Sequence, residues 1–471
     1  MVFSSMVFLC FFFPLVILLH TLLPSVKLKN AVLLLFSLLF YAWGEPKLIL
    51  SMLLVTAVNY FCALLISRTE KKGRRRLLFI LGLIAGLAAL LYYKYSAFLV
   101  NSACSLFGLS FRMEAPSLPI GISFYTFQLI TYTADVYRQK IPVQRSFFRL
   151  LLYVSLFPQL IAGPIVRYSD VAERIEKRRV TVKGLGEGFF RFTLGLAKKV
   201  VLANRCGEIL ETLPAAAEMT FFSGWLGAVL FLLQLYFDFA GYSDMAIGIG
   251  RMLGFKFREN FDAPFISADV SEFWRRWHIS LGAFFREYVY IPLGGNRVGK
   301  GRWLVNMLIV WGLTGIWHGA DWSFVCWGLY FGLWIILERT VLEKPLRHIP
   351  GVFRHFGTVV LAVTGFVFFN NETFAEILAQ LAAMYAPFAR GWSDAYAVYA
   401  FKDNAVFLLI ACICCLPLRK RAARAFRRRK RAGKKNRGRV YLMAALSVAF
   451  LLVSLLFLAG QSYNPFLYFR F

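Results

Sequence analysis

Residues 221–250 of the chain read FFSGWLGAVLFLLQLYFDFAGYSDMAIGIG, a run that contains no Lys, Arg, Glu or His and only two Asp. A helix needs about 20 predominantly apolar residues to cross the hydrocarbon core of a bilayer, and this run is longer. At helical spacing Gln234, Asp238, Gly241 and Tyr242 share one face. The stretch therefore predicts a long membrane helix with a polar face.

Apolar runs recur on both sides of this segment along the whole chain. Of the 471 residues, 59% are hydrophobic and 17% are charged, against about 25% charged in soluble proteins. The composition predicts an all-α polytopic membrane protein with about 11–13 transmembrane helices, plus re-entrant and interfacial helices. We expect crossings near residues 6–25, 30–43, 48–67, 77–99, 118–135, 184–203, 221–250, 303–319, 322–340, 352–369, 403–418 and 440–460.

The chain reads as one membrane domain over residues 1–471, without an internal repeat or a soluble domain. Within it we distinguish N-terminal helices (1–220), a core (221–340) and C-terminal helices (341–471). The apolar run 148–165 is interrupted by two prolines and a glycine. Such breakers predict a re-entrant segment that other helices shield from lipid.

The net charge of +29 is concentrated in a few loops. Loops 68–76 and 166–183 hold six basic residues each, and loop 419–439 holds thirteen with no acid. Because basic loops stay on the cytoplasmic side, the pattern predicts twelve crossings with both termini outside, which place every basic loop in the cytoplasm. Binding of loop 419–439 to nucleic acid is the less favoured alternative to contact with anionic membrane lipids.

Motifs for metals and nucleotides are incomplete. The eight cysteines form no C-x-x-C pair, and H-E-x-x-H is absent, so we expect no metal site. Gly294 to Lys300 fit G-x-x-x-x-G-K, but Gly301 stands where a phosphate loop needs Ser or Thr. We interpret this segment as a glycine-rich turn and expect no bound cofactor.

Two of the five histidines lie in unusual surroundings. His278 follows a dense aromatic and basic segment, SEFWRRW, and His318 lies near the end of an apolar run. An ionisable group within a membrane protein is costly and is therefore a functional candidate, and histidine moves protons near neutral pH. Acyl transfer to a hydroxyl needs such a base. A helix–helix hydrogen bond is the simpler alternative for a lone membrane histidine.

Asp238 needs a partner inside its aromatic run. Arg275, Arg276 and Arg286 are the basic residues that we expect to supply it. A structural ion pair and a channel wall are both open interpretations of this polar face.

The motifs together resemble the membrane-bound O-acyltransferase family, especially its bacterial branch of alginate O-acetyltransferases and D-alanyl-teichoic acid transfer proteins. The resemblance extends over nearly the whole chain, and PLGGNR at 292–297 favours the alginate type. The segments that carry it are FYAWGEPK (40–47), FPQLIAGPI (157–165), YFDFAGYSDMAIG (236–248), ENFDAPF (259–265), SEFWRRWHISL (271–281), FFREYVYIPLGGNR (284–297), LTGIWHGA (313–320) and YNPFLYFRF at the end.

The resemblance implies a ring of helices around a central tunnel, where an acyl donor from one side meets an acceptor from the other. It matches His318 to the catalytic histidine of the family and His278 to its second histidine. We expect the tunnel and the substrate contacts to involve Trp274, Trp277, Trp317, Arg275, Arg276, Arg286, Asp238, Gln234 and Tyr242.

The expected function is transfer of an acetyl or similar acyl group across the membrane to an extracytoplasmic polysaccharide. The co-substrate would be acetyl-CoA or an acyl-carrier thioester on the cytoplasmic side, and the resemblance implies an extracytoplasmic esterase-like partner. D-alanyl transfer to teichoic acid from a carrier protein is the alternative within this class. A flippase for a lipid-linked sugar is the alternative from another class, but it would often show inverted repeats. A third alternative is a non-catalytic scaffold, in which replacement of His318 would leave the function of the protein intact.

Overall fold

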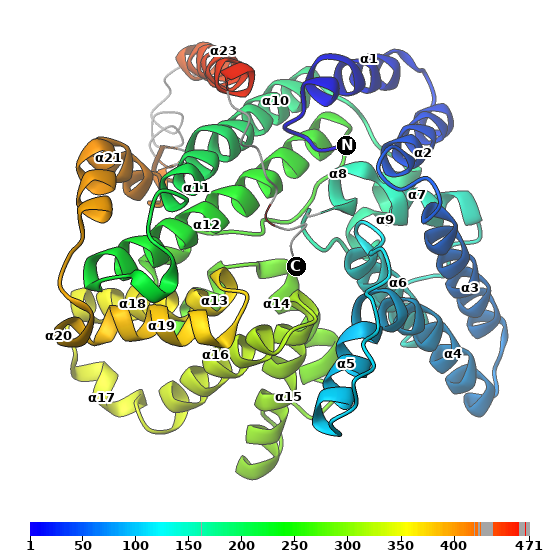
Figure 1. Cartoon of the computed structure of the whole chain (residues 1–471). Coiled ribbons are helices and arrows are strands. Elements are labelled where there is room, and N and C mark those ends of the chain that lie inside the picture. The colour runs from blue at the N-terminus through cyan, green and yellow to red at the C-terminus, as the bar shows by residue number, and fades with distance from the viewer. Residues whose placement is uncertain (162, 419, 423, 425–436, 461–466, 468–471) are drawn as a thin grey trace. The chain divides into compact units, whose positions relative to one another are not determined.

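The computed structural model describes residues 1–471 except 162, 419, 423, 425–436, 461–466 and 468–471 (Figure 1). All regular elements of the described residues are helices, which confirms the predicted all-α class. Contacts divide the chain into two compact units. Unit 1 comprises residues 1–192 and 242–258, and unit 2 comprises residues 193–241 and 259–471. Helices α10 (Val182–Ala197) and α12 (Phe221–Met252) contribute residues to both.

In unit 1, α3, α4 and α6 pack against one another. Gly82 of α4 makes this close approach possible, because a Cβ there would lie 3.2 Å from both Asn59 Oδ1 and Thr133 Cγ2. The buried Thr133 hydroxyl donates to Asn59 Oδ1 at 2.8 Å and so joins α6 to α3. Small residues and interhelical hydrogen bonds are the usual means of helix packing in membranes. The helices of this unit are η1 (Phe8–Phe12), α1 (Phe13–Leu22), α2 (Val26–Ala42), α3 (Ile49–Arg68), α4 (Lys72–Leu90), η2 (Leu91–Tyr95), α5 (Ser96–Leu106), α6 (Ile122–Tyr137), α7 (Phe147–Ser155), α8 (Phe157–Leu160) and α9 (Tyr168–Glu176).

The predicted re-entrant segment 148–165 is a broken helix, formed by α7 and the single turn of α8. Its backbone groups at the break find partners inside the protein. The Phe157 N–H donates to Ser37 Oγ at 3.1 Å, and the Tyr153 hydroxyl donates to the Val166 carbonyl at 2.8 Å. Both Tyr153 and Phe157 are fully buried. The segment is therefore broken and shielded by protein, as irregular backbone in a membrane protein must be.

Unit 2 contains the hairpin of α15 and α16. Gly315 and Gly328 lie where the two helices touch, and a Cβ on either would overlap a backbone carbonyl of the other helix. Asp321 caps α16 by accepting the Ser323 N–H at 2.8 Å. The helices of this unit are η3 (Lys198–Ala203), α11 (Asn204–Leu210), η4 (Ala216–Glu218), η5 (Pro264–Ile266), α13 (Val270–Arg276), α14 (Ile279–Phe285), η6 (Arg286–Tyr290), α15 (Lys300–His318), α16 (Trp322–Thr340), α17 (Glu343–His348), α18 (Gly351–Asn370), α19 (Phe374–Tyr385), α20 (Pro387–Arg390), α21 (Ala395–Cys414) and α23 (Arg437–Gly460).

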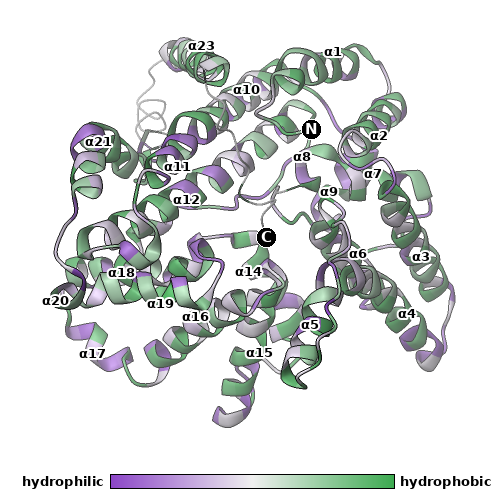
Figure 2. Ribbon diagram, viewed as in Figure 1, coloured by the Kyte–Doolittle hydropathy of each residue, from purple (hydrophilic) through white to green (hydrophobic). Residues whose placement is uncertain are grey.

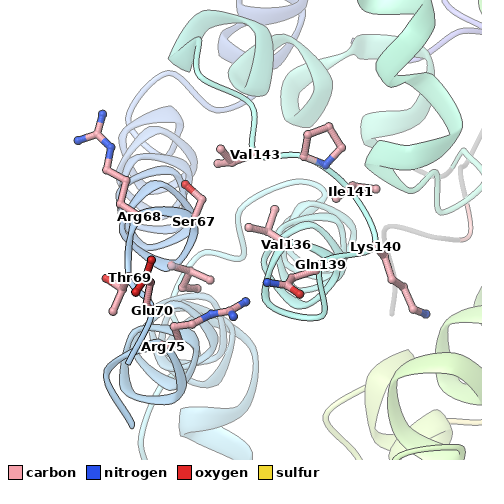
Figure 3. Close-up of a pocket in the computed structure, with 12 residues that line it drawn as sticks. Ser67, Arg68, Thr69, Glu70, Arg75, Val136, Gln139, Lys140, Ile141 and Val143 are labelled. Carbon is pink, nitrogen blue, oxygen red and sulfur yellow. The ribbon is translucent and has the colours of Figure 1, made fainter. Parts of the chain in front are cut away.

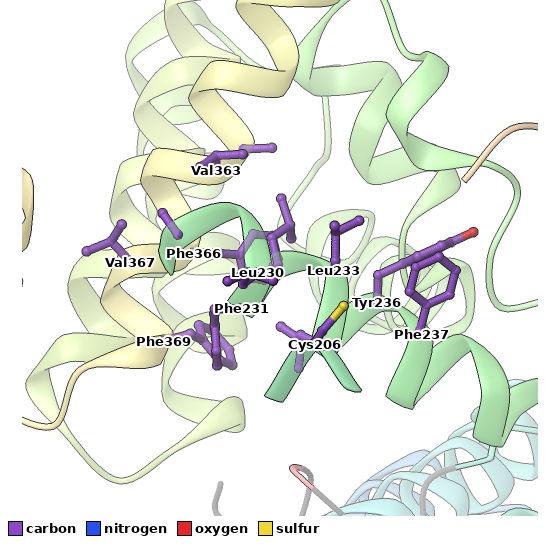
Figure 4. Packing of buried hydrophobic residues seen from close by; sticks show 14 of the residues in the cluster. Cys206, Leu230, Phe231, Leu233, Tyr236, Phe237, Val363, Phe366, Val367 and Phe369 are labelled. Atoms are coloured by element: carbon purple, nitrogen blue, oxygen red, sulfur yellow. The ribbon is translucent and has the colours of Figure 1, made fainter. Parts of the chain in front are cut away.

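The core of unit 2 is a continuous apolar cluster to which α12 and α18 contribute many side chains (Figure 4). Leu230, Phe231 and Phe237 come from α12, and Phe366 and Phe369 come from α18. All five are less than a tenth exposed. The cluster extends to Trp277 and Trp327, which border the two conspicuous histidines, so the packing that stabilises this unit also holds their surroundings.

Six described segments are long and apolar enough to cross a membrane, and most of their length is coloured as hydrophobic in Figure 2. Each coincides with a predicted crossing, and the chain is a multi-pass membrane protein. The remaining predicted crossings fall on helices that are shorter or less apolar, such as α2 and α6, so their membrane path stays a prediction. The six segments are Ile49–Arg68, Lys72–Leu106, Phe221–Met252, Gly351–Asn370, Ala395–Cys414 and Gly438–Gly460.

Candidate active site

His278 lies at a sharp break between α13 and α14. Asp269 caps α13 by accepting the Glu272 N–H, and the helix ends at Arg276. The backbone of His278 then takes the left-handed conformation, with φ 45° and ψ 53°. Left-handed conformations are uncommon for residues other than glycine, and they concentrate at functional sites. The break turns the His278 ring into the interior, where the residue is only 2% exposed.

One edge of the His278 ring is held by Asn260. Nδ1 of His278 lies 3.1 Å from Asn260 Oδ1, which also accepts the Ser280 hydroxyl at 2.8 Å and the Ser280 N–H at 3.3 Å. Asn260 itself is 1% exposed. Asn260 was not among the residues selected from the sequence; its place within the ENFDAPF motif is the signal that could have identified it.

The other edge of His278 faces aromatic rings and the second histidine. Its ring centroid lies 4.7 Å from Phe239, 5.8 Å from Trp317 and 6.3 Å from His318. Nε2 is buried and makes no hydrogen bond within the described part of the chain. Burial lowers the pKa of His278 to about 3, so the imidazole is neutral near pH 7.

His318 is the last residue of α15 and is 8% exposed. Its ring contacts Trp317, Trp327 and Phe369 at centroid distances of 4.9, 4.9 and 5.2 Å. The two histidines selected from the sequence are thus brought together and buried inside unit 2, with their ring centroids 6.3 Å apart.

The predicted tryptophans pack in this region, but not all of them touch the histidines. Trp317 contacts both imidazoles. Trp274 packs on Trp327, Trp311 and Phe331 at 4.9 to 5.3 Å, one layer behind His318. Trp277 is 3% exposed and lies stacked on Phe273. The rings form an apolar wall that lowers the local dielectric constant around the imidazoles.

Asp238 pairs with Lys199, which the sequence analysis had not considered. Lys199 Nζ lies 2.9 Å from Asp238 Oδ1, and the two side chains are 4% and 3% exposed. Lys199 also donates to Asn204 Oδ1 at 2.9 Å, and the Leu467 N–H donates to Asp238 Oδ2 at 2.9 Å. A Cβ on Gly241 would lie 2.7 Å from a backbone oxygen of the neighbouring helix, so this glycine permits the approach.

The prediction that an arginine of the 275–286 segment pairs with Asp238 is therefore wrong. Arg275 lies 3.8 Å from Asp269, and Arg276 donates to Glu272 at 2.7 Å, so both use acids next to or on their own helix. Arg286 is exposed. Glu272 is one helical turn from Arg276 on α13, and Arg276 also lies 3.7 Å from Asp262.

The other two polar residues of α12 that were selected from the sequence are buried in different units. Gln234 is 4% exposed and belongs to unit 2. Tyr242 is 2% exposed and belongs to unit 1, where its ring stacks on Phe3 at 4.5 Å. Substrate contacts of Gln234, Asp238, Tyr242 and the three arginines stay predictions.

The described residues contain no group of three His, Cys, Asp or Glu side chains that could hold a metal ion. A cavity of about 510 Å³ lies in unit 1 between the ends of α3 and α6 (Figure 3). Arg75 points into it and donates to the Tyr137 carbonyl at 3.0 Å, whereas Arg68 and Lys140 point away. The histidine pair is the stronger candidate for catalysis.

The candidate site is thus a pair of buried imidazoles inside a helical membrane protein. Comparison with known proteins identifies the family. The family model described as MBOAT, membrane-bound O-acyltransferase family, matches residues 136–344, which include both histidines.

Curated relatives extend the match over the whole chain. The chain is 38% identical to the probable alginate O-acetylase AlgI of Pseudomonas putida, with full coverage of both proteins. It is 41% identical to the probable AlgI of Pseudomonas syringae, over 79% of this chain and 73% of that protein. It is 35% identical to the peptidoglycan O-acetyltransferase of Helicobacter pylori, over 75% and 73%. The chain belongs to the membrane-bound O-acyltransferase family and is an O-acyltransferase.

Proposed function

We propose that this enzyme passes an acetyl or similar acyl group across the bacterial cytoplasmic membrane for O-acylation of an extracytoplasmic polysaccharide. The observation that carries the proposal is the pair His278 and His318, buried with ring centroids 6.3 Å apart. The names of the relatives, which cite alginate and peptidoglycan, support a polysaccharide as the final acceptor.

In the proposed reaction His318 is the general base. Its imidazole takes the proton from an acceptor hydroxyl, and the hydroxyl oxygen attacks the carbonyl carbon of an acyl thioester. The new ester forms as the carbon–sulfur bond breaks, and the thiolate leaves and regains a proton. A positioned base typically contributes about 10²–10⁴-fold to the rate. The aromatic wall excludes water, which would otherwise hydrolyse the thioester.

The donor is proposed to be acetyl-CoA or an acyl-carrier thioester that enters from the cytoplasm. The concentration of basic residues in loops 68–76 and 166–183 supports that orientation, with both termini outside. His278 would contact the donor or acceptor from the inner side. Trp274, Trp277 and Trp317 would line the passage between the two faces.

The acceptor at His318 is proposed to be a hydroxyl group on the outer side, either of the polysaccharide or of an esterase-like partner that completes the transfer. The alternative, D-alanyl transfer to teichoic acid, is supported by a weaker relative. That protein, a teichoic acid D-alanyltransferase of Streptococcus thermophilus, is 29% identical over 54% of this chain.

Mass spectrometry of envelope polysaccharides tests the proposal. We expect cells that carry the enzyme to show O-acetyl groups that disappear on deletion and return with the wild-type gene. Alanyl esters in place of acetyl esters would select the alternative. An unchanged set of polysaccharide esters after deletion would refute the function.

A further inference from the structure

Asn260 is held rigidly beside His278 by its backbone as well as its side chain. The Ile279 N–H donates to the Asn260 carbonyl at 2.9 Å, and the Asp262 N–H donates to the Arg276 carbonyl at 2.9 Å. These two bonds fasten the chain around Asn260 along residues 276–279. The position of the Asn260 amide relative to the His278 ring is therefore fixed by the backbone.

The hydrogen bonds also determine which way the Asn260 amide points. A backbone N–H can only donate, so the group 3.3 Å from the Ser280 nitrogen must be the amide oxygen. The same oxygen lies 3.1 Å from His278 Nδ1. Because an oxygen of this kind only accepts, Nδ1 must carry a hydrogen. A neutral imidazole carries one N–H, so Nε2 then has a free lone pair.

A purely structural role for Asn260 would account for only part of this arrangement. The two bonds from Ser280 are enough to stabilise the start of α14. They do not explain why His278 Nε2 is buried without a hydrogen bond within the described residues. Buried polar atoms are normally paired, and an exception is accounted for when a ligand supplies the partner.

We propose that Asn260 is a positioning residue that fixes His278 in the Nδ1–H tautomer, so that Nε2 accepts a hydrogen bond from an O–H or N–H of the substrate. The inference rests on the proposed function of the histidine pair. In this tautomer Nε2 of neutral His278 carries no hydrogen, so Nε2 cannot donate a hydrogen bond to the oxyanion of the reaction. Trapping the wrong tautomer of a catalytic histidine is known to impair enzymes severely.

Nitrogen NMR of the protein with ¹⁵N-labelled histidine tests the tautomer without any substrate. The His278 signals are assigned by their loss in His278→Gln. We expect a protonated Nδ1 and an unprotonated Nε2 in the wild type and in Asn260→Asp, which keeps an acceptor oxygen. In Asn260→Ala we expect a mixture of both tautomers. A wild-type His278 protonated at Nε2 would overturn the inference, whatever the reaction proves to be.

Activity then separates positioning from structural damage. We expect Asn260→Ala to lower acyl transfer about 10–100-fold, the usual cost of losing an orienting partner of a functional histidine. Asn260→Asp should recover much of this rate. Because a carboxylate favours the imidazolium, the loss of rate at low pH should begin at a higher pH in this variant than in the wild type. Asn306→Ala, which removes another fully buried amide, is the matched control. Equal losses in both alanine variants, with unchanged pH profiles, would refute positioning.

Discussion

Replacing Asp238 by Asn should destabilise the protein strongly, because it removes the carboxylate that pairs with the buried Lys199 ammonium. The two side chains are 4% and 3% exposed and their charged atoms are 2.9 Å apart. Breaking a buried ion pair by removing one partner typically costs about 3–5 kcal/mol. Each kcal/mol lowers Tm by about 2–4 °C in a domain of 150–250 residues and by less in a longer chain, so at about 1–2 °C per kcal/mol we expect a decrease of roughly 3–10 °C.

The assay is thermal unfolding of the purified protein in detergent, with Lys199→Met and the double variant measured beside Asp238→Asn. The double variant removes both charges, so it should be clearly more stable than either single variant. If Asp238 serves only this pair, a folded double variant retains acyl transfer. A melting curve of Asp238→Asn that coincides with the wild type would refute the reasoning. Loss of activity in a stable double variant would instead restore Asp238 to the substrate passage.

Further predictions concern packing, charge and pH. Gly328→Ala should reduce thermal stability sharply, because a Cβ there would overlap the α15 backbone. Gly312→Ala, where a Cβ would meet open space, should leave stability unchanged. Equal effects of the two substitutions would contradict the close contact between α15 and α16. A cysteine placed in loop 419–439, most of which lies outside the described residues, should not be labelled by an impermeant thiol reagent added outside the cell. Labelling of this cysteine would show that the predicted topology is inverted. Between pH 6.5 and 4, His278 is protonated in the unfolded chain but not in the folded protein. Tm should therefore decrease as the pH is lowered, and it should decrease less steeply in His278→Gln. Equal slopes would show that His278 contributes nothing.

The sequence predicted the helical class and the broken segment 148–165, and it singled out two histidines that the structure buries close together. These features follow from local signals: long apolar runs, prolines, and rare ionisable residues in apolar surroundings. That His278 and His318 meet could not be derived from spacing, because it depends on the left-handed break at His278 and on where α15 ends.

The partner of Asp238 was predicted wrongly for a physical reason. Arg275, Arg276 and Arg286 were expected to supply the partner, but contact between helices is decided by small residues that permit close approach. Gly241 gives Lys199 that access. Likewise, the placement of Asn260 beside His278 depends on two backbone hydrogen bonds between residues 260–262 and 276–279, which the ENFDAPF motif alone does not predict.

The central claim is that a buried histidine carries out acyl transfer, and one measurement tests it most directly. Wild type and His318→Ala are reconstituted in vesicles with labelled acetyl thioester on one side and the acceptor on the other, at matched amounts of folded protein. The account predicts that His318→Ala lowers the rate of labelled ester formation by about 10²–10⁴-fold. Retention of half the wild-type rate by this variant would contradict it.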